Sequence, residues 1–371
     1  MSTVLNSKPH YPVLDGLRGV AAIVVVAFHI LETFNTSRFD QIINHGYLAV
    51  DFFFLLSGFV IGYAYDDRWG KMTVKEFFKR RLIRLQPMVV MGMIVGALLF
   101  YTQAGEFWPT IAQTPVWKML LVMLIGFTLI PVPISMDIRG WWEMHPLDGP
   151  AWSLFFEYIG NILYALFIRR FSKLLLGVFV ALSAAFLVHL LFTNGNGDVI
   201  GGWALNGEQL HIGSARLLYP FFAGLLLSRV AKLTVVRNAF LWCSLLLVLI
   251  LALPRIGGPD TVWMNGLYES FAIILVFPLI VWLGASDAAG QQPSKLCRFL
   301  GDISYPIYIT HYPLIYTYTA WVKDNKVPLK DGWLWGVGVL VASILLAYAC
   351  FKLYDVPVRK WLTRKFQAAK A

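Results

Sequence analysis

The stretch from Tyr11 to Phe34 is apolar, yet it carries a guanidinium and an imidazole, Arg18 and His29. Ionisable groups inside an apolar membrane span are costly and commonly mark a functional site. Eleven residues of helix leave the two side chains about 20° apart around the axis and about 16 Å apart along it. One helix face therefore carries a cation near one membrane surface and a titratable ring near the other. The alternative is that Arg18 snorkels to the headgroups and His29 is a hydrogen-bonded packing residue.

A second set of polar residues follows helical spacing in the segment GPAWSLFFEYIGNILY. Ser153, Glu157, Asn161 and Tyr164 form one stripe of an otherwise apolar helix. This helix is expected to enter from the outer surface, which places Glu157 at the depth of His29, and we expect the two to hydrogen-bond. A carboxylate that holds one imidazole nitrogen leaves the other as a general base. A buried structural ion pair is the competing interpretation.

A basic amphipathic stretch from Lys71 to Pro87 contains Arg80, Arg81 and Arg84. Arg81 and Arg84 are three residues apart on one helix face, so their planar forks can converge on a phosphate. Such clusters also fix topology or contact anionic lipids. Arg18 enters from the same side and favours the phosphate interpretation.

Two further stretches place polar groups on apolar helices. In GYLAVDFFFLLSGFVIGY, Asp51, Gly58 and Gly62 share a stripe, which indicates either a pore carboxylate or close packing of helices at small residues. In GDISYPIYITHYPL, Ser304, Tyr308 and His311 share another face, while Pro306 and Pro313 predict local unwinding beside a cavity. A satisfied core histidine is the alternative for His311. Trp141, Trp142, Trp152 and Trp263 fall where an interfacial aromatic belt is expected, which by itself indicates no chemistry.

The composition is that of a polytopic membrane protein. The 371 residues are 58% hydrophobic and 14% charged, with a mean hydropathy of +0.64. The net charge of +10 comes from basic residues in short loops between apolar runs, which argues against nucleic-acid binding. Cys243, Cys297 and Cys350 are isolated, so neither a metal site nor redox chemistry is predicted.

The apolar runs predict an all-α bundle of ten membrane-spanning helices. A further apolar run near 116–134 is bracketed by prolines and is predicted to be re-entrant or non-crossing. No soluble domain is predicted, because the polar connections are too short to fold alone. The spanning runs are expected near 11–34, 47–65, 88–104, 152–168, 174–192, 212–228, 239–253, 266–284, 303–322 and 333–352.

The positions of lysine and arginine predict the orientation. Basic loops at 68–84, 169–173, 229–237 and 295–298, with the tail from Lys352, Lys8 and Arg18, hold 23 of the 31 basic residues. Because basic loops usually remain cytoplasmic, both termini are predicted to lie in the cytoplasm.

Several of these stretches, in order, resemble the acyltransferase 3 family of integral membrane acyltransferases. The resemblance covers Tyr11 to Lys360, as a single transmembrane domain over 11–360 followed by a basic tail at 361–371. The arginine, ten residues, then histidine spacing is its most specific element. Asp355 departs from the pattern, since members often have Glu there. The segments that carry the resemblance are DGLRGVAAIVVVAFH, GYLAVDFFFLLSGF, RRLIRLQP, AWSLFFEY, GDISYPIYITHYPL and YDVPVRK.

The resemblance implies transfer of an acyl group, usually acetyl, from cytoplasmic acyl-coenzyme A to a hydroxyl of an extracytoplasmic or lipid-linked carbohydrate. It implies a multi-pass protein of the plasma (inner) membrane and no metal. Acceptor recognition is expected from the bundle or a partner, because no hydrolase-like domain follows the last span. Arg80, Arg81 and Arg84 would hold the coenzyme phosphates, Arg18 would guide the donor, His29 would act as general base or transient acyl carrier, and Glu157 would orient His29. The substrate path is expected to include Asp51, Ser57, Trp152, Ser153, Ser304, Tyr305, Tyr308 and His311.

Two other classes of protein fit part of the pattern. A transporter or lipid-linked sugar flippase also has a polar-lined helix bundle, but it would normally show related halves, and none are detectable. A structural envelope component has no need of His29 and Glu157 in apolar spans.

Overall fold

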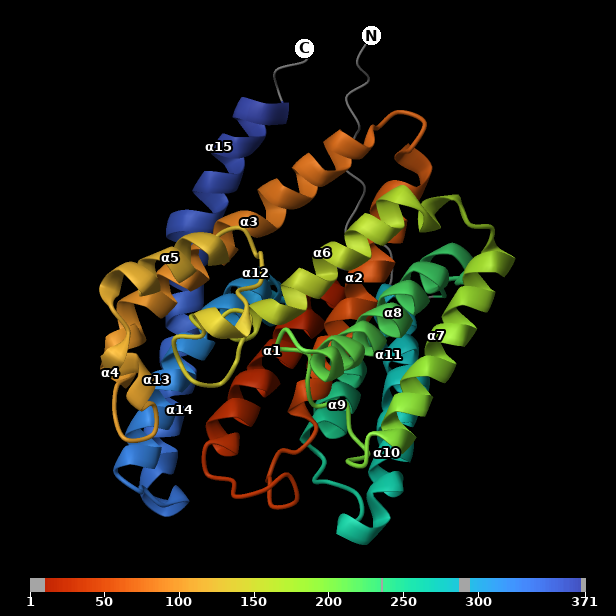
Figure 1. Cartoon of the computed structure of the whole chain (residues 1–371). Helices are drawn as coiled ribbons and strands as arrows, with labels where there is room; N and C mark the ends of the chain where they lie inside the picture. The colour runs from red at the N-terminus through yellow and green to blue at the C-terminus, as the bar shows by residue number, and fades with distance from the viewer. Residues whose placement is uncertain (1–10, 235, 287–293, 368–371) are drawn as a thin grey trace.

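The computed structural model describes residues 11–234, 236–286 and 294–367. The regular structure in these ranges is helical, with no strand, which confirms the predicted all-α class (Figure 1). The helices are α1 Pro12–Glu32, α2 Ala49–Tyr65, α3 Val74–Leu99, α4 Pro109–Gln113, α5 Val116–Gly126, α6 Ala151–Leu166, α7 Lys173–Thr193, α8 Gly207–Val230, α9 Ala239–Ala252, α10 Val262–Phe271, α11 Phe277–Ala285, α12 Lys295–Thr310, α13 Tyr312–Asp324, α14 Leu329–Cys350 and α15 Val356–Gln367.

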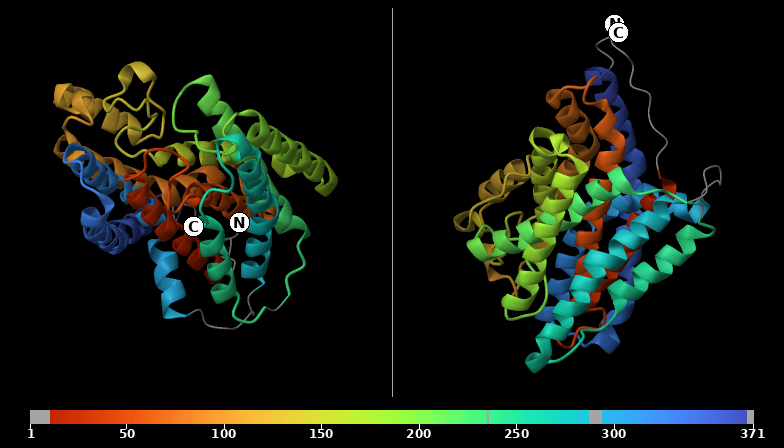
Figure 2. Two further views of the ribbon diagram at one scale, coloured as in Figure 1. Left: turned by 90° about the horizontal axis from the view of Figure 1, so that it is seen from below. Right: turned by 90° about the vertical axis from the view of Figure 1, so that its right-hand side faces the viewer.

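Helix α1 is the centre of the bundle. It packs against α12, α9, α14, α11, α13 and α2, and in Figure 2 the red helices α1 and α2 lie inside a ring of the other segments. The approach to α12 is close, because a Cβ on Gly19 would lie 2.2 Å from the carbonyl oxygen of Leu300. The small residues of α1 thus allow close packing against its neighbours, and this packing places Arg18 and His29 inside the bundle.

The two ends of α1 define the two ends of the bundle. We call the end at Pro12 proximal and the end at Glu32 distal. At the proximal end, the ring of Tyr11 contacts Phe59 and Tyr63 near the end of α2.

Basic segments that the charge rule assigned to one side of the membrane meet at the proximal end. Arg229 donates to the Asp66 carboxylate at 2.6 Å and to the carbonyl of Phe171 at 3.0 Å, which ties the ends of α2, α6 and α8 together. The guanidinium of Arg169 lies 4.0 Å from the ring centre of Trp69. Lys8 lies outside the described residues, and the predicted tail is described only as far as the end of α15.

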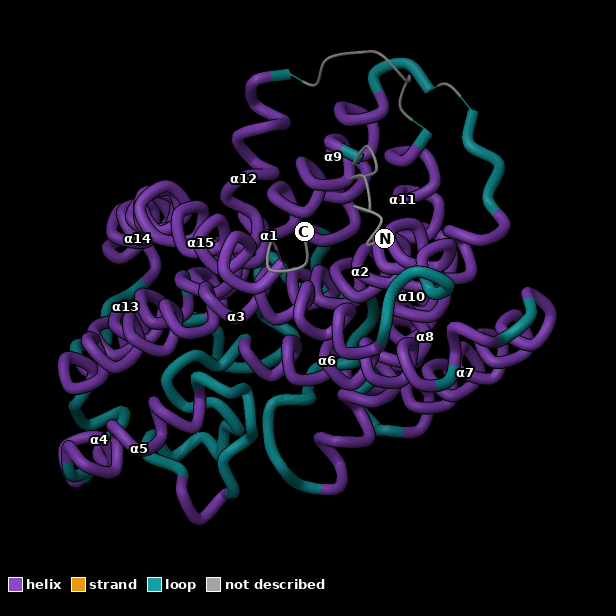
Figure 3. Tube along the Cα trace, turned by 90° about the horizontal axis from the view of Figure 1, so that it is seen from above, coloured by secondary structure: helices purple, strands orange, loops and turns teal. Residues whose placement is uncertain are grey.

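Seven helical segments of the described chain are long and apolar enough to cross a membrane. Helices α5 and α9 are apolar but shorter. Eleven residues of α5 extend about 16 Å, against a hydrocarbon core of about 30 Å, so α5 does not cross by itself. A largely irregular segment at 127–150, with one short 3-10 turn at Ile134–Met136, follows α5 and appears among the teal loops beside α4 and α5 in Figure 3. The predicted count of ten crossings stays a prediction.

The small-residue stripe of α2 packs against α8. A Cβ on Gly58 would lie 1.7 Å from the carbonyl oxygen of Phe221, and one on Gly62 would lie 2.0 Å from Oγ of Ser228. The predicted glycine packing groove is therefore confirmed, with α8 as the partner.

Helix geometry is interrupted at two places that bear on the site. The helix containing Pro306 ends at Thr310, and α13 begins at Tyr312 with Pro313 in its first turn. The predicted interruption is therefore present as a break between α12 and α13 at His311, but the backbone is not unwound there, since His311 keeps helical dihedral angles and its N–H bonds to the carbonyl of Ile307. A π-helical turn at Phe351–Asp355 separates α14 from α15, and such turns often occur at functional positions.

Candidate active site

The proximal half of the bundle contains a cavity of about 590 Å³. Its lining is rich in arginine, as the phosphate interpretation of the sequence requires. Both signs of charge are present, and the five arginines exceed the four carboxylates. The charged lining residues are Asp15, Arg18, Arg81, Arg84, Glu157, Arg298, Asp302, Asp355 and Arg359.

Arg84 is the most available cation of this cavity. Its side chain is exposed to the cavity, and the charges that act on it include those of Arg18, Asp15, Arg81 and Arg359. Among the described residues, no carboxylate lies within 4.0 Å of its guanidinium, whereas Arg18 lies 3.3 Å from Asp15. Arg84 is therefore placed to take an anionic ligand.

The predicted arginine cluster is divided in the structure. Arg80 is not part of the cavity lining. Arg81 is buried and donates to Oε1 of Glu157, which also accepts from the hydroxyl of Ser57 at 2.6 Å. Arg81 and Ser57 thus hold Glu157 in place at the cavity wall.

The distal half of the bundle contains a second cavity, of about 770 Å³. Ionisable groups come from His29, Glu32, Glu143, Glu208, Arg216 and Lys323. Ten of the other lining residues are aromatic. The aromatic lining residues are Phe28, Tyr47, Phe107, Trp141, Trp142, Trp152, Trp203, Tyr308, Tyr312 and Tyr316.

His29 is positioned in the distal cavity by its own helix and by the break after α12. Its Nδ1 lies 2.8 Å from Oε2 of Glu32, and 18% of the imidazole side chain is exposed. The edge of Tyr312 packs on the ring with centroids 4.7 Å apart, and His311 stacks on it at 5.7 Å. The hydrogen bonds found among the described residues involve Nδ1 of this ring and not Nε2.

His311 is fully buried behind His29. Its Nδ1 lies 2.9 Å from the carbonyl oxygen of Ile307, while its Nε2 has no partner in the structure. It is not part of either cavity lining. His311 therefore lies against the ring of His29 and outside both cavity linings, although the sequence placed it among the pore residues.

The predicted contact between His29 and Glu157 is wrong. Glu157 lines the proximal cavity and His29 the distal one. The reason is that α6 begins in the interior, because the segment before it is inserted into the bundle and Leu147 and Asp148 are fully buried. Glu157 therefore lies closer to the proximal end than a helix starting at the outer surface would place it. The hydrogen-bond partner of His29 is instead Glu32. The sequence carries a signal for this pair, because the two residues are three apart, about one helical turn, in the pattern H-x-x-E.

Two residues line both cavities, Val50 and Tyr308. The hydroxyl of Tyr308 lies 2.6 Å from Oγ of Ser153, and Phe53 packs edge-on against its ring at 5.2 Å. We call the side chains of Val50, Phe53, Ser153 and Tyr308 the wall. The proximal and distal cavities therefore meet at these side chains, and His29 lines the distal one.

Asp51 belongs to the bundle scaffold. It is fully buried, and Arg216 of α8 donates to Oδ2 at 2.7 Å and to Oδ1 at 3.3 Å. Arg216 also donates to the carbonyl of Tyr47 at 2.7 Å and lies 5.2 Å from the ring of Trp152. Asp51 itself lines neither cavity, so the packing alternative for this residue fits the structure.

Ser304 and Tyr305 line the proximal cavity, but their hydroxyls are already engaged by the backbone. Ser304 donates to the carbonyl of Gly301 at 2.8 Å, and Tyr305 donates to the carbonyl of Leu85 at 2.8 Å. Trp152 lines the distal cavity, and Ser153 lines the proximal one at the wall.

Comparison with known proteins adds to this geometry. Residues 11–352 match the family described as an acyltransferase domain. The chain belongs to the acyltransferase 3 family. The predicted resemblance is thus confirmed, and the match argues for an enzyme over the transporter alternative.

The relatives of this acyltransferase include O-acetyltransferases. It is 25% identical to the O-acetyltransferase OatA of Staphylococcus aureus over 96% of its length and 58% of that protein. It is 26% identical to the peptidoglycan O-acetyltransferase OatA of Listeria monocytogenes over 96% of its length and 57% of that protein. The chain thus spans somewhat more than half the length of these relatives. It is also 32% identical to protein 2 in the picA locus of Rhizobium radiobacter, over 47% of this chain and 91% of that one. No solved structure matches.

Burial sets the ionisation of the segment before α6 in this acyltransferase. It raises the pKa of Glu143 to about 7, although Arg139 opposes the shift. It lowers the pKa of His145 to about 3. Asp148 has its pKa raised well above the usual range by the same cause. Burial therefore favours the neutral forms of His145 and Asp148.

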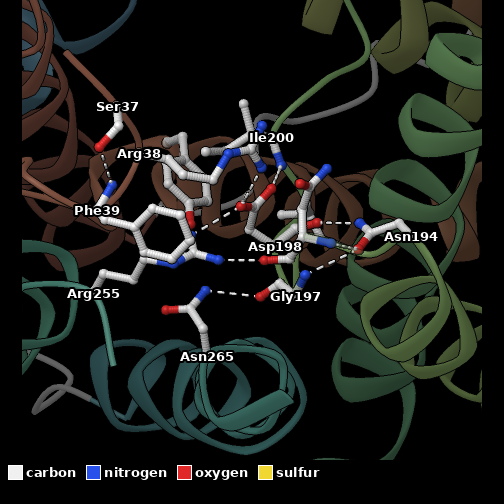
Figure 4. A network of polar contacts seen from close by, with 12 residues as sticks. Ser37, Arg38, Phe39, Asn194, Gly197, Asp198, Ile200, Arg255 and Asn265 are labelled. Atoms are coloured by element: carbon white, nitrogen blue, oxygen red, sulfur yellow. Dashed lines mark hydrogen bonds and ion pairs between the residues drawn. The ribbon is translucent and has the colours of Figure 1, made fainter. Parts of the chain in front are cut away.

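The distal loops of the acyltransferase are held by a polar network that the sequence did not reveal. Asp198 accepts hydrogen bonds from Arg38 at 2.7 Å and Arg255 at 2.9 Å, and Asn265 donates to the carbonyl of Gly197 at 2.8 Å (Figure 4). These contacts join the loop after α1 to those before α8 and α10. They hold the distal rim together without lining the proximal cavity.

The described residues contain no group of three or more His, Cys, Asp and Glu side chains placed to hold a metal ion.

Proposed function

We propose that this acyltransferase moves an acetyl group from acetyl-coenzyme A to a hydroxyl of an extracytoplasmic or lipid-linked carbohydrate. The observation that carries the proposal is the pair of cavities, one rich in arginine and one rich in aromatic residues, that meet at Val50 and Tyr308. OatA of Listeria monocytogenes, a relative, is named a peptidoglycan O-acetyltransferase. The proximal cavity suits a polyphosphate donor and the distal cavity a polar acceptor.

The proposed setting is the plasma (inner) membrane, with the proximal end and both termini in the cytoplasm. In this topology ten helices cross, α5 and the segment 127–150 do not, residues 11–360 form one domain, and 361–371 form a basic tail. The clustering of the ends of α2, α6 and α8 at one end supports it. A cytoplasmic reporter fused after Lys173 should be active and one fused after Asn196 inactive, and the reverse result would contradict this orientation.

Donor binding is assigned to the proximal arginines. Arg84, with no carboxylate within ion-pair distance among the described residues, would contact the coenzyme phosphates, and Arg18 would do so from α1. Arg81 donates a hydrogen bond to Glu157, so its proposed role is to keep the Glu157 side chain in place in the lining of the proximal cavity. The acyl end of the donor would then point towards Tyr308.

The chemistry is assigned to His29. Its Nε2 would take the proton of the acceptor hydroxyl as the oxygen attacks the thioester carbonyl. The new C–O ester bond forms, the C–S bond breaks, and the imidazolium returns the proton to the departing coenzyme thiolate. Glu32 would hold Nδ1–H and stabilise the transient positive charge. The hydroxyl of Tyr308, at the wall, would donate a hydrogen bond to the carbonyl oxygen.

The proposal is tested with inverted membrane vesicles that contain the protein and are given labelled acetyl-coenzyme A. We expect label in alkali-labile esters of the envelope carbohydrate in vesicles with the wild-type protein and not with His29→Ala. Equal labelling in vesicles from a deletion strain would overturn the proposal, as would full activity of a folded His29→Ala variant.

A further inference from the structure

A short loop before α6 holds two tryptophans at the edge of the distal cavity. Trp142 has a left-handed backbone with φ of +57°, and 61% of its surface is exposed. A bulky residue in this conformation is an outlier, and such strain concentrates at functional sites. Both Trp141 and Trp142 line the cavity.

The loop is held in this conformation by Asp137. Its Oδ2 accepts from the backbone N–H groups of Gly140 at 2.9 Å and Trp142 at 2.8 Å, and its Oδ1 accepts from that of Arg139 at 2.9 Å. Three main-chain donors on one carboxylate fix the turn. The exposed indole is therefore presented by a preorganised loop, not by a mobile one.

The next residue adds a buried carboxylate to this aromatic surface. Glu143 accepts from the hydroxyl of Tyr316 at 2.6 Å, and Nε of Arg139 lies 3.6 Å from it. The guanidinium of Arg139 in turn lies 3.5 Å from the ring centre of Tyr316. Glu143 also bridges to Ala204, the residue after Trp203, which brings the other distal loop to the same site.

We propose that the loop from Asp137 to Glu143 is the acceptor-recognition site and that it takes a neutral pyranose ring. In this site Trp142 stacks on the C–H face of the sugar, and Glu143 accepts a hydrogen bond from a ring hydroxyl. The inference rests on the proposed transfer to a carbohydrate and adds the site that selects the sugar.

The chemistry of the cavity favours a sugar over other occupants. The negative face of an indole attracts the partly positive C–H groups of a pyranose, and oriented carboxylates distinguish its hydroxyls. A lipid chain would lay hydrocarbon against the charged side chains of Glu32, Glu208 and Lys323 and offer them no hydrogen bond. A phosphate group would meet three lining carboxylates, those of Glu32, Glu143 and Glu208, against the two cations Lys323 and Arg216, and Arg216 is already paired with Asp51.

The direct test measures sugar binding to the purified full-length protein in nanodiscs. Methyl β-glycosides of glucose, galactose, mannose and N-acetylglucosamine serve as probes in saturation-transfer NMR with irradiation of aromatic protons. We expect a signal with at least one of them for the wild-type protein, its loss in Trp142→Ala, and partial retention in Trp142→Phe. Trp263→Ala is the matched control, because Trp263 is 52% exposed and lies outside both cavity linings.

A kinetic test follows the acetyl transfer itself. In Trp142→Ala and in Glu143→Gln we expect the KM for the carbohydrate acceptor to rise about tenfold, which corresponds to about 1.4 kcal/mol. An unchanged acceptor KM in folded Trp142→Ala, or equal NMR signals in the two proteins, would overturn the inference. A wild-type protein that binds glycosides but transfers no acetyl group would overturn the proposed function and leave the sugar site standing. Absence of glycoside binding by the wild-type protein would overturn the site.

Discussion

Nδ1 of His29 and Oε2 of Glu32 lie 2.8 Å apart, one helical turn along α1. The carboxylate therefore comes from the same helix as the imidazole, and no movement between helices is needed to assemble the pair. Because α1 packs against six other helices, the ring is carried by a helix that is enclosed on several sides.

Glu32→Gln should lower the kcat of acetyl transfer at least about tenfold, because the amide no longer stabilises the imidazolium. His29→Ala and His29→Gln should both abolish transfer, and the double variant His29→Ala/Glu32→Gln should be hardly worse than His29→Ala. A change in the pH profile of kcat in Glu32→Gln separates positioning of the ring from mere packing. Equal kcat and an identical pH profile would remove Glu32 from the mechanism.

Arg84→Ala should raise the KM for the acyl donor without unfolding the protein, since this side chain is exposed to the cavity and makes no ion pair with a described residue. Arg84→Lys should recover only part of the loss, because an ammonium lacks the bidentate fork. Arg80→Ala is the matched control and should leave the donor KM unchanged. The same donor KM for Arg84→Ala and Arg80→Ala would contradict the assignment.

Asp51→Ala should lower stability by about 3 to 5 kcal/mol, since it leaves the buried guanidinium of Arg216 without its carboxylate. The double variant Asp51→Ala/Arg216→Met removes both charges and should recover part of that loss. Thermal unfolding in detergent measures the effect, with Glu106→Ala at an exposed position as the control. If Asp51→Ala unfolds at the wild-type temperature while activity is lost, Asp51 acts on the substrate path after all.

Glu143 should make the stability of the protein depend on pH. Its pKa in the folded protein, about 7, lies above the ordinary value of 4.5, so the folded state binds the additional proton between these values. The contribution of Glu143 to the free energy of unfolding is therefore largest below pH 4.5 and is lost as the pH rises to about 7. Glu143→Gln should flatten this part of the curve of melting temperature against pH. A wild-type slope in Glu143→Gln would show that another group is responsible.

The arrangement of α1 and α2 could be predicted from the sequence because it depends on local spacing. The helix that carries Arg18 and His29 is present, and the stripe of Asp51, Gly58 and Gly62 faces one partner helix. Which helix that partner is could not be predicted, because Arg216 is one of several arginines and only packing selects it.

The depth of Glu157 could not be read from the sequence for a related reason. The prediction assumed that α6 starts at the membrane surface, whereas the inserted segment 127–150 starts it in the interior. Arg298 and Arg359 were counted as topological charges, and only the fold shows that they share a cavity with Arg84. Tertiary insertion of an irregular segment leaves no periodic signal in a sequence.

The wall formed by Val50, Phe53, Ser153 and Tyr308 has a further consequence for the cell. Two cavities with charged linings that approach each other across a bilayer would form an ion leak if the layer between them opened. In the proposed mechanism these side chains would act as an electrical insulator as well as a passage for the acyl group. A variant widened at Val50 to admit longer acyl chains should then depolarise the membrane, and in that case conductance would limit the size of the acyl group.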